Sequence, residues 1–294
     1  MAKGKTRYAE ELTYRARILR LLPRNDLGDW LFAAILFRRS HGRWPQRSGG
    51  LISDAMFRLR ASAEITRPLR VYVTDKEQLK DYVRGKLGDR FNVPTIALLR
   101  SREEIDRFEF PQRCVIKPTH MSGSVILRMA GEPIDLDRLA RWFAADYYDY
   151  ARERNYRGLT PKIIVEPFVF DQNWPNAFRI FCLHGRARLL HVNIDRPGEL
   201  TRSFYDPDWN ALPIFSNDRA SAGFPRPANL SLILQVAETL SRDFDFIRVD
   251  LYSDDVAVKV SELTNCPFNA LFPFASRESE ELASQAIFGG VDRE

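Results

Sequence analysis

A lysine at the end of an apolar run, followed by a loop of small residues, is the first chemically suggestive feature of the sequence. Residues 114–116 lead into Lys117, and the loop contains Ser122, Gly123 and Ser124. A lysine at a strand end can reach a phosphate, while Gly123 permits close backbone approach and the serines are natural phosphate donors. The Gly-x-x-x-x-Gly-Lys-Ser pattern of a Walker loop is absent. An ordinary hairpin with a solvated lysine is the structural alternative.

Two carboxylates far downstream have the chemistry of a magnesium site. Asp250 and Glu262 stand twelve residues apart across a predicted hairpin turn, and Asn265 or Thr264 offers a third oxygen. Hard oxygen ligands on adjacent strands suit Mg²⁺, with nucleotide oxygens and water completing the octahedron. The two carboxylates share a face only if the turn has the right parity, which the sequence does not fix. Surface charges on an exposed hairpin are the alternative.

A third group of residues suits an adenosine. Glu166 follows an apolar run and precedes Phe168, and Asp171 comes shortly after. The backbone there could take the adenine edge, and Glu166 or Asp171 could accept from a ribose hydroxyl. Arg248 lies two residues before Asp250, on the same strand face, where it could neutralise a γ-phosphate. A strand-end Glu166 that faces solvent is the alternative.

Apolar periodicity predicts the elements that position these groups. Helical spacing predicts helices at residues 5–22, 27–38, 53–63, 75–87, 135–150 and 229–243. Short apolar or alternating runs predict strands at residues 69–73, 93–99, 113–117, 125–128, 162–169, 177–183, 187–194, 247–252 and 256–260. Asn25 or Asp26 could cap the second helix, and residues 184–186 have the composition of a hairpin turn.

Composition excludes several classes of protein. The chain has 294 residues, of which 45% are hydrophobic and 28% charged, so a folded core is expected and extensive disorder is not. The apolar run at residues 30–37 is far shorter than the roughly 20 residues that a membrane span needs. Cys114, Cys182 and Cys266 lack metal-ligand spacing, so we expect buried, reduced cysteines in a cytoplasmic protein.

The charge of the chain is unevenly distributed. The net charge is +5, yet residues 1–60 carry 13 Lys/Arg against 5 Asp/Glu, and the remainder is net −3. A basic segment beside a slightly acidic body suggests an acidic partner, which could be nucleic acid, an anionic bilayer or an acidic polymer. We find no nucleic-acid motif, so no specific nucleic-acid partner is expected. A merely solvated basic face is the alternative.

The order of these motifs resembles the ATP-grasp superfamily and, more narrowly, the TupA-like ATP-grasp family, which is named for teichuronopeptide biosynthesis. The resemblance spans about residues 70–275. It rests on Lys117 with its loop and on residues 74–76, 165–169, 178–185, 195–196, 204–206, 208–209, 248–252 and 262–264. This chain departs from the family at Asn176-Ala177, at Arg179, where a lysine is usual, and at residues 265–267.

The resemblance implies an α+β ATP-grasp fold, in which two α+β subdomains clasp ATP. It divides the chain into a basic helical segment (1–68), an N-terminal and lid subdomain (69–170) and a C-terminal subdomain with the metal site (171–294). Lys76 and Lys117 would hold phosphates, and the loop with Ser122, Gly123 and Ser124 would close as a lid. The other implied ligands are Glu166 and Phe168 for adenosine and Asp250 and Glu262 for magnesium. His120, in the lid, could touch phosphate.

The activity implied is ATP- and Mg²⁺-dependent ligation of a carboxylate to an amine through an acyl phosphate. Arg179 and Arg196, with Arg248, could grip the carboxylate or the phosphate, because a guanidinium binds either in bidentate fashion. By family context the carboxylate would be a uronic acid of a surface polysaccharide and the amine an amino acid. Such an enzyme would be cytoplasmic, with at most peripheral contact at the inner membrane face. A kinase acting on a sugar hydroxyl and a non-catalytic glycan-binding protein are the alternatives.

Overall fold

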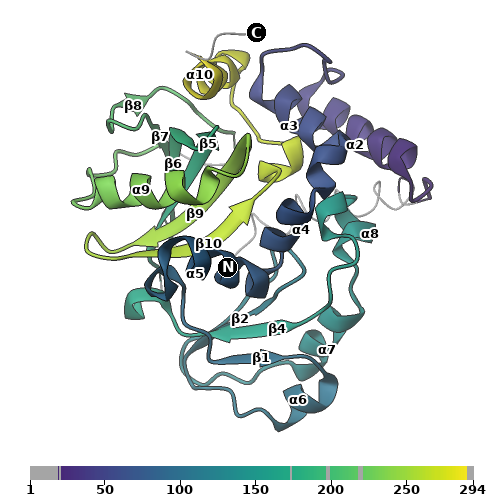
Figure 1. The fold of residues 1–294 in the computed structure, drawn as a ribbon, viewed down its shortest axis with the longest axis vertical. Coiled ribbons are helices and arrows are strands. Elements are labelled where there is room, and N and C mark those ends of the chain that lie inside the picture. The colour runs from purple at the N-terminus through teal and green to yellow at the C-terminus, as the bar shows by residue number, and fades with distance from the viewer. Residues whose placement is uncertain (1–18, 20, 173, 197–198, 218–220, 290–294) are drawn as a thin grey trace.

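The computed structural model describes residues 19, 21–172, 174–196, 199–217 and 221–289. Its strands form two antiparallel sheets, one above the other in Figure 1. The six-stranded sheet has the order β10-β9-β5-β6-β7-β8, and the four-stranded sheet has the order β1-β4-β2-β3. The strands are β1 (Ala97–Leu99), β2 (Cys114–Pro118), β3 (Ile126–Arg128), β4 (Ile163–Glu166), β5 (Asn176–Leu183), β6 (Arg186–Arg196), β7 (Glu199–Tyr205), β8 (Ala211–Leu212), β9 (Phe246–Ser253) and β10 (Val258–Thr264).

Helices cover both sheets and fill the region between them. Figure 1 shows α4 and α5 between the two sheets, while α2, α3 and α10 lie at the far end of the six-stranded sheet. The α-helices are α2 (Asp26–His41), α3 (Ile52–Ala61), α4 (Pro68–Thr74), α5 (Lys76–Leu87), α6 (Arg102–Arg107), α7 (Leu136–Ala144), α8 (Tyr147–Ala151), α9 (Leu230–Ser241) and α10 (Arg277–Phe288). Short 3₁₀ turns are η1 (Ala63–Thr66), η2 (Asp89–Phe91), η3 (Arg154–Tyr156), η4 (Val169–Asp171) and η5 (Pro267–Ala270).

The two faces of the six-stranded sheet differ in chemistry. Side chains alternate along a strand, so Ile180 of β5 and Val249 and Leu251 of β9 share one face, where they pack against α5 and α9. The opposite face carries Arg248 and Asp250 of β9. Apolar residues of α3, η5 and α10 cover the end of that face. The polar middle of this face is therefore available for chemistry.

The four-stranded sheet has its own core. Ile116 of β2 and Ile163 and Val165 of β4 are fully buried against Leu139 and Trp142 of α7. In β2 this alternation leaves Lys117 on the face opposite Ile116. The loop with Ser122, Gly123 and Ser124 joins β2 to β3, as the sequence predicts.

Most predicted elements are present, and two predictions are wrong. Residues 69–73 alternate like a strand but form helix α4, because Pro68 occupies its first turn. Arg70 then points inward and donates to Phe246 O and Asn265 Oδ1, both at 3.0 Å. The helix predicted at 135–150 is divided, since Asp146 caps a new helix by accepting from Tyr148 N. The predicted helix at 5–22 lies largely outside the described residues.

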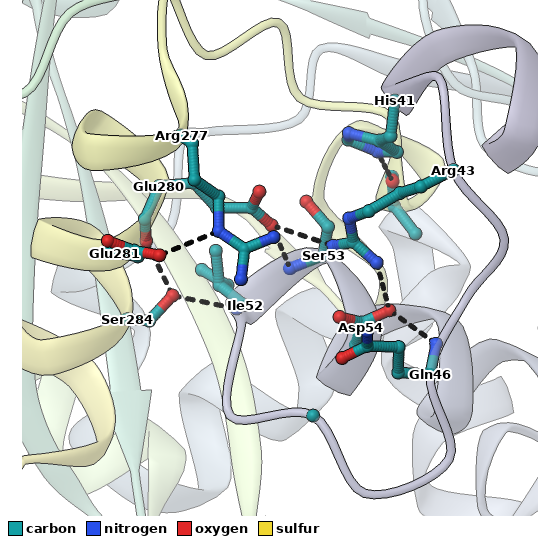
Figure 2. A network of polar contacts seen from close by, with 12 residues as sticks. His41, Arg43, Gln46, Ile52, Ser53, Asp54, Arg277, Glu280, Glu281 and Ser284 are labelled. Carbon is teal, nitrogen blue, oxygen red and sulfur yellow. Dashed lines mark hydrogen bonds and ion pairs between the residues drawn. The ribbon is translucent and has the colours of Figure 1, made fainter.

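The N-terminal helices are fastened to α10 by a buried polar network, shown in Figure 2. Asp54 Oδ1 accepts from the Arg43 guanidinium and from Gln46 N, both at 2.8 Å. Arg43 also lies 3.6 Å from Glu280 of α10, whose carboxylate accepts from Ser53 N at 3.3 Å. Helices α2 and α3 therefore pack with α10 on the six-stranded sheet as part of the same body. Among the described residues, every helix is too short or too polar to cross a bilayer.

Candidate active site

Lys117 and Glu166 meet because β2 and β4 are neighbours in the four-stranded sheet. Lys117 Nζ lies 2.6 Å from Glu166 Oε2, and Lys80 Nζ lies 2.6 Å from Glu166 Oε1. Burial alone would raise the pKa of Glu166, which is 4% exposed, but the two ammonium groups hold it below its ordinary value. Burial in turn acts to lower the pKa of Lys117, but the charge and hydrogen bond of Glu166, together with Tyr252 and Glu262, raise it above its ordinary value. Glu166 thus occupies a position between two cations where a phosphate oxygen could replace it.

Lys80 is a member of this cluster that the sequence analysis missed. It lies one turn beyond Lys76 on α5, on the same helix face, and that spacing was the available signal. Its Nζ also donates to Val93 O and to Thr95 Oγ1, both at 2.7 Å. Lys80 is therefore a positioned group, not a mobile surface lysine.

Lys76 is the first residue of α5 and reaches the loop after β2. Its Nζ donates to Met121 O at 2.7 Å, and its backbone N–H donates to Thr119 O. Asp75 caps α5 and also accepts from the Thr119 hydroxyl at 3.0 Å, with Lys162 3.1 Å away. Burial lowers the pKa of Lys76, and the charge of Glu262 opposes that effect. Residues at the start of α5 thus hold the segment that leads into the predicted lid loop by hydrogen bonds, and they place the Lys76 ammonium against it.

Asp250 and Glu262 lie directly opposite each other on β9 and β10. A bulge between Val260 and Glu262 sets this register, so the two carboxylates share a face. Arg248 binds Asp250 in bidentate fashion, at 2.6 and 2.7 Å, and donates to Thr264 Oγ1 at 3.1 Å. Arg179 lies 3.7 Å from Asp250. Burial lowers the pKa of the Arg248 guanidinium, but Asp250 holds it above its ordinary value.

The lysines and the carboxylates belong to one locality. Glu262 is close enough for its charge to raise the pKa of both Lys76 and Lys117. A bridge between Asn92 and Val260 ties β10 to the segment after α5, between the two sheets. Cations for a polyphosphate and an oxygen ligand for a divalent ion are therefore near enough to act on one another electrostatically.

The donor set fits magnesium bound together with a nucleotide. Within the described residues, no three His, Cys, Asp or Glu side chains are arranged to hold a metal ion. The two facing carboxylates supply hard oxygens, so the remaining positions would fall to phosphate oxygens and water. The Thr264 hydroxyl, on the same face, is the nearer third oxygen.

Three predicted site residues contact other groups than those expected, and the side chain of a fourth is not described. Asn265 is bound to α4: its amide donates to Arg70 O and Thr74 Oγ1 and accepts from Arg70, so we leave it out of the metal site. His120 belongs to the loop between β2 and β3, but its side chain is buried, with Nε2 3.0 Å from Trp142 O of α7. Asp171 is largely exposed and pairs with Arg113, whose guanidinium covers the Phe168 ring. The side chain of Arg196 is not among those that the structure describes.

The loop itself is bent by Gly123, whose φ of 78° lies in the left-handed region. Ser122 acts to lower the raised pKa values of Tyr147 and Tyr156, two aromatic residues that the sequence analysis did not single out. The buried carboxylate of Glu153 lies beside Tyr147, and it too was missed. Their run of mixed charges and aromatics has no periodicity that would have identified them.

Comparison with known proteins identifies a family. The model of the TupA-like ATP-grasp family matches residues 56–287. No curated protein matches the chain. The family match covers all the lysines and carboxylates described above.

Solved structures with a similar fold include several ligases. D-alanine–D-alanine ligase from Helicobacter pylori is 16% identical over 74% of this chain and 62% of its own, with a TM-score of 0.41. L-amino acid ligase from Bacillus licheniformis is 14% identical over 73% and 49%, with a TM-score of 0.43. The ATP-grasp ligase PsnB, complexed with a phosphomimetic minimal precursor, Mg and ADP, is 15% identical over 96% and 73%, with a TM-score of 0.39. The chain spans about three fifths of the first ligase, and likenesses at these scores say nothing about function.

Proposed function

The chain belongs to the TupA-like ATP-grasp family, and from this premise we propose that it is an ATP- and Mg²⁺-dependent ligase that joins a carboxylate to an amine. One observation carries the proposal. Glu262 faces Asp250 directly and also acts electrostatically on Lys76 and Lys117. Two cations and two oxygen ligands at one place are what a nucleotide triphosphate with its metal requires.

In the first step a substrate carboxylate oxygen attacks the γ-phosphorus of ATP. The bond from phosphorus to the β,γ-bridging oxygen breaks, ADP leaves, and an acyl phosphate forms. Lys117 and Lys76 would lie against the transferred phosphoryl oxygens, and Arg248 would neutralise the charge that develops there. Magnesium, when bound at Asp250 and Glu262, supplies Lewis-acid stabilisation of the same charge.

In the second step the amine nitrogen attacks the acyl carbon. The bond from carbon to the phosphate oxygen breaks, inorganic phosphate leaves, and the nitrogen loses a proton to give an amide. Water would destroy the acyl phosphate, so the loop with Ser122, Gly123 and Ser124 would act as the lid that excludes it. Glu166 and Phe168 would line the adenosine pocket, with Asp171 as a further ribose acceptor and Arg179 beside the reacting carboxylate.

The acceptor that we favour is a uronic acid of an acidic glycan, with an amino acid as the amine. The charge asymmetry supports this choice, because Arg38, Arg39 and Arg47 are exposed at the basic end of the chain. Arg43 is held by Asp54 and belongs to the fold. Neutralising the three exposed arginines should weaken binding of polyglucuronate, and raising the salt concentration should do the same. Binding that is indifferent to both changes would remove the glycan from the proposal.

The ligase proposal is tested by product analysis. Wild-type protein is incubated with ATP, Mg²⁺, hydroxylamine and a panel of carboxylates that includes glucuronate and oligoglucuronates. Hydroxylamine traps an acyl phosphate as a hydroxamate, so the expected products are ADP, phosphate and hydroxamate in equal amounts. A phosphorylated sugar without free phosphate would instead identify a kinase. ATP turnover without either product, or no turnover at all, would contradict the ligase assignment.

A further inference from the structure

The polar face of the six-stranded sheet continues beyond the two carboxylates of the candidate metal site. Asp250 of β9 lies directly opposite Arg179 of β5, and Arg179 lies directly opposite His191 of β6. Asn193 follows two residues after His191 on the same strand, so its side chain shares this face. Neighbouring strands are about 4.8 Å apart, which places His191 about 10 Å from Asp250 and one strand beyond Arg179. The row therefore leads from the proposed place of phosphoryl transfer towards β6.

His191 and Asn193 form a buried polar pair that is only half satisfied. They are 0% and 2% exposed, and His191 Nε2 lies 2.5 Å from Asn193 Oδ1. Because an amide oxygen only accepts, Nε2 carries the hydrogen, and Nδ1 of the neutral ring keeps a lone pair. Burial and the charges of three arginines hold the pKa of His191 well below its ordinary value, in agreement with a neutral ring. Within the described part of the chain, Nδ1 and the Asn193 amide nitrogen have no hydrogen-bond partner.

The two remaining groups, one acceptor and one donor, define the chemistry of a ligand. A carboxylate only accepts and an ammonium only donates, so either would leave one member of the pair buried without a partner. A hydroxyl does both, so one hydroxyl, or two neighbouring ones, can satisfy His191 Nδ1 and the Asn193 amide together. Neighbouring hydroxyls are the usual substituents of a sugar ring. The pair therefore suits a ligand that carries hydroxyls.

The side chain of Phe268 covers His191. Its ring lies nearly parallel to the His191 ring, with centroids 6.2 Å apart, and the guanidinium carbon of Arg248 lies 5.5 Å from its centroid. Phe268 is only partly buried, and the residues 268–270 of η5 have φ values of 54°, 58° and 63°. Non-glycine residues rarely adopt this left-handed region, and such residues gather at ligand clamps and switch segments. We expect the Phe268 ring to turn aside when a ligand reaches His191.

We propose that His191 and Asn193 bind hydroxyls of the acid substrate, and that this substrate is a sugar acid whose carboxylate lies at Arg179. His191 Nδ1 accepts from one hydroxyl, and the Asn193 amide donates to the same hydroxyl or to its neighbour. The step of one strand from Arg179 to His191 is about 5 Å, which is comparable with the width of a sugar ring. The proposal rests on the ligase function, and it gives the acid a chemical class on grounds independent of the basic N-terminal segment.

The test compares two acids that share a six-membered ring. Glucuronate carries ring hydroxyls, and cyclohexanecarboxylate carries none. With ATP, Mg²⁺ and hydroxylamine, wild type should form hydroxamate from glucuronate with a kcat/KM at least about 100-fold higher than from cyclohexanecarboxylate. His191→Phe keeps an aromatic ring but removes both nitrogens, and Asn193→Leu removes the amide. Each should lower kcat/KM for glucuronate about tenfold or more, through KM, and leave that for cyclohexanecarboxylate within about twofold.

Val192 provides the matched control, because it lies between His191 and Asn193 but points to the opposite face, into the core beneath α9. Val192→Ala should lower the urea midpoint and leave the preference between the two acids unchanged. The double variant His191→Phe/Asn193→Leu separates binding from folding. Since it replaces both members of a half-satisfied pair by apolar groups, its urea midpoint should equal or exceed that of wild type, while the preference for glucuronate is lost.

Equal losses with both acids in the two single variants would overturn the subsite. An unchanged preference in these variants would overturn it too, and would mean that the pair holds only internal water. Wild type that forms hydroxamate from cyclohexanecarboxylate as readily as from glucuronate would overturn the subsite but leave the ligase standing. No hydroxamate from any carboxylate would overturn both.

Discussion

Glu280 and Glu153 are equally hidden from solvent, at 5% and 7% exposure, but their surroundings are opposite. Glu280 accepts from Ser53 N and lies beside the Arg43 guanidinium, so the fold uses its charge (Figure 2). Glu153 has no ion-pair partner among the described residues, and burial with the charge of Glu262 raises its pKa against the opposing charge of Arg60. Burial therefore does not distinguish a functional carboxylate from a structural one. The distinction lies in whether the surrounding protein already satisfies the charge.

Glu166 is an intermediate case that sharpens the comparison. Its carboxylate is satisfied, but by Lys117 and Lys80, the cations that a phosphate would also seek. The network at Asp54 is made by the Arg43 guanidinium, which also lies beside Glu280, and by the backbone N–H of Gln46. An ion pair that can be exchanged for substrate belongs to a site, and one that holds two elements together belongs to the fold.

The largest effect is expected from removing Lys117. Lys117→Met deletes the cation proposed to stabilise the transferred phosphoryl group, and loss of one such group lowers kcat by about 100- to 1000-fold. The measurement is the rate of ADP release with Mg²⁺ and the best carboxylate. Glu280→Gln provides the baseline, because its rate should match that of wild type. A Lys117→Met rate within about threefold of wild type would remove Lys117 from the site.

The next largest effect is a loss of stability that leaves the activity of the folded protein unchanged. Asp54→Asn breaks the ion pair with Arg43, whose side chain is 22% exposed, and should lower the free energy of unfolding by about 3 kcal/mol. Urea denaturation measures this loss. ADP release per folded molecule should stay unchanged at a temperature where the variant is folded. If ATP turnover fell in proportion to that loss while the variant remained folded, the network would not be purely structural.

The contrast between local and long-range contacts also explains which elements and site residues could be predicted from the sequence. Hairpins and most helices were predicted because their signals are local: apolar alternation at residues 177–183 and 247–252, and the helical spacing of apolar residues at 75–87. Lys117, Asp250 and Glu262 were found because each sits in a recognisable motif. Glu153 carries no such signal, and Lys80 carries only its helical spacing from Lys76. Their surroundings form only when α5, α8 and the two sheets are assembled. The strand predicted at 69–73 failed because Pro68 begins a helix there, in which Arg70 reaches partners 176 and 195 residues away.

A third prediction concerns the cost of the Glu153 charge. Its folded pKa of about 7 lies above the ordinary 4.5, so the folded state binds a proton that the unfolded state has lost between these values. Stability contributed by the protonated form is therefore complete below pH 4.5 and is lost as the pH rises to about 7. Without metal or nucleotide, the free energy of unfolding of Glu153→Gln at pH 8 should exceed that of wild type by about 2–3 kcal/mol.

The difference in free energy of unfolding between Glu153→Gln and wild type should vanish at pH 4.5. Urea midpoints at the two pH values measure it, with EDTA present so that no ion binds Glu262. Glu280→Gln, whose lost carboxylate has partners, should be destabilised at pH 8 instead. If both variants changed in the same direction, the two buried carboxylates would not differ as the structure indicates.

The smallest effect is expected at Lys80, which shares Glu166 with Lys117. Lys80 also donates to Val93 O and Thr95 Oγ1, so its ammonium is directed partly away from the lid loop. In Lys80→Met, Glu166 keeps only Lys117 as its partner, and ATP must compete for Lys117 against a stronger ion pair. The dissociation constant of ATP should therefore rise by about tenfold or less, with kcat nearly unchanged. Calorimetric titration with ATP and Mg²⁺ measures this. A loss as large as that in Lys117→Met would mean that Lys80 itself acts on the transferred phosphate. Lys80 would then belong with Lys117 among the cations that exchange Glu166 for substrate.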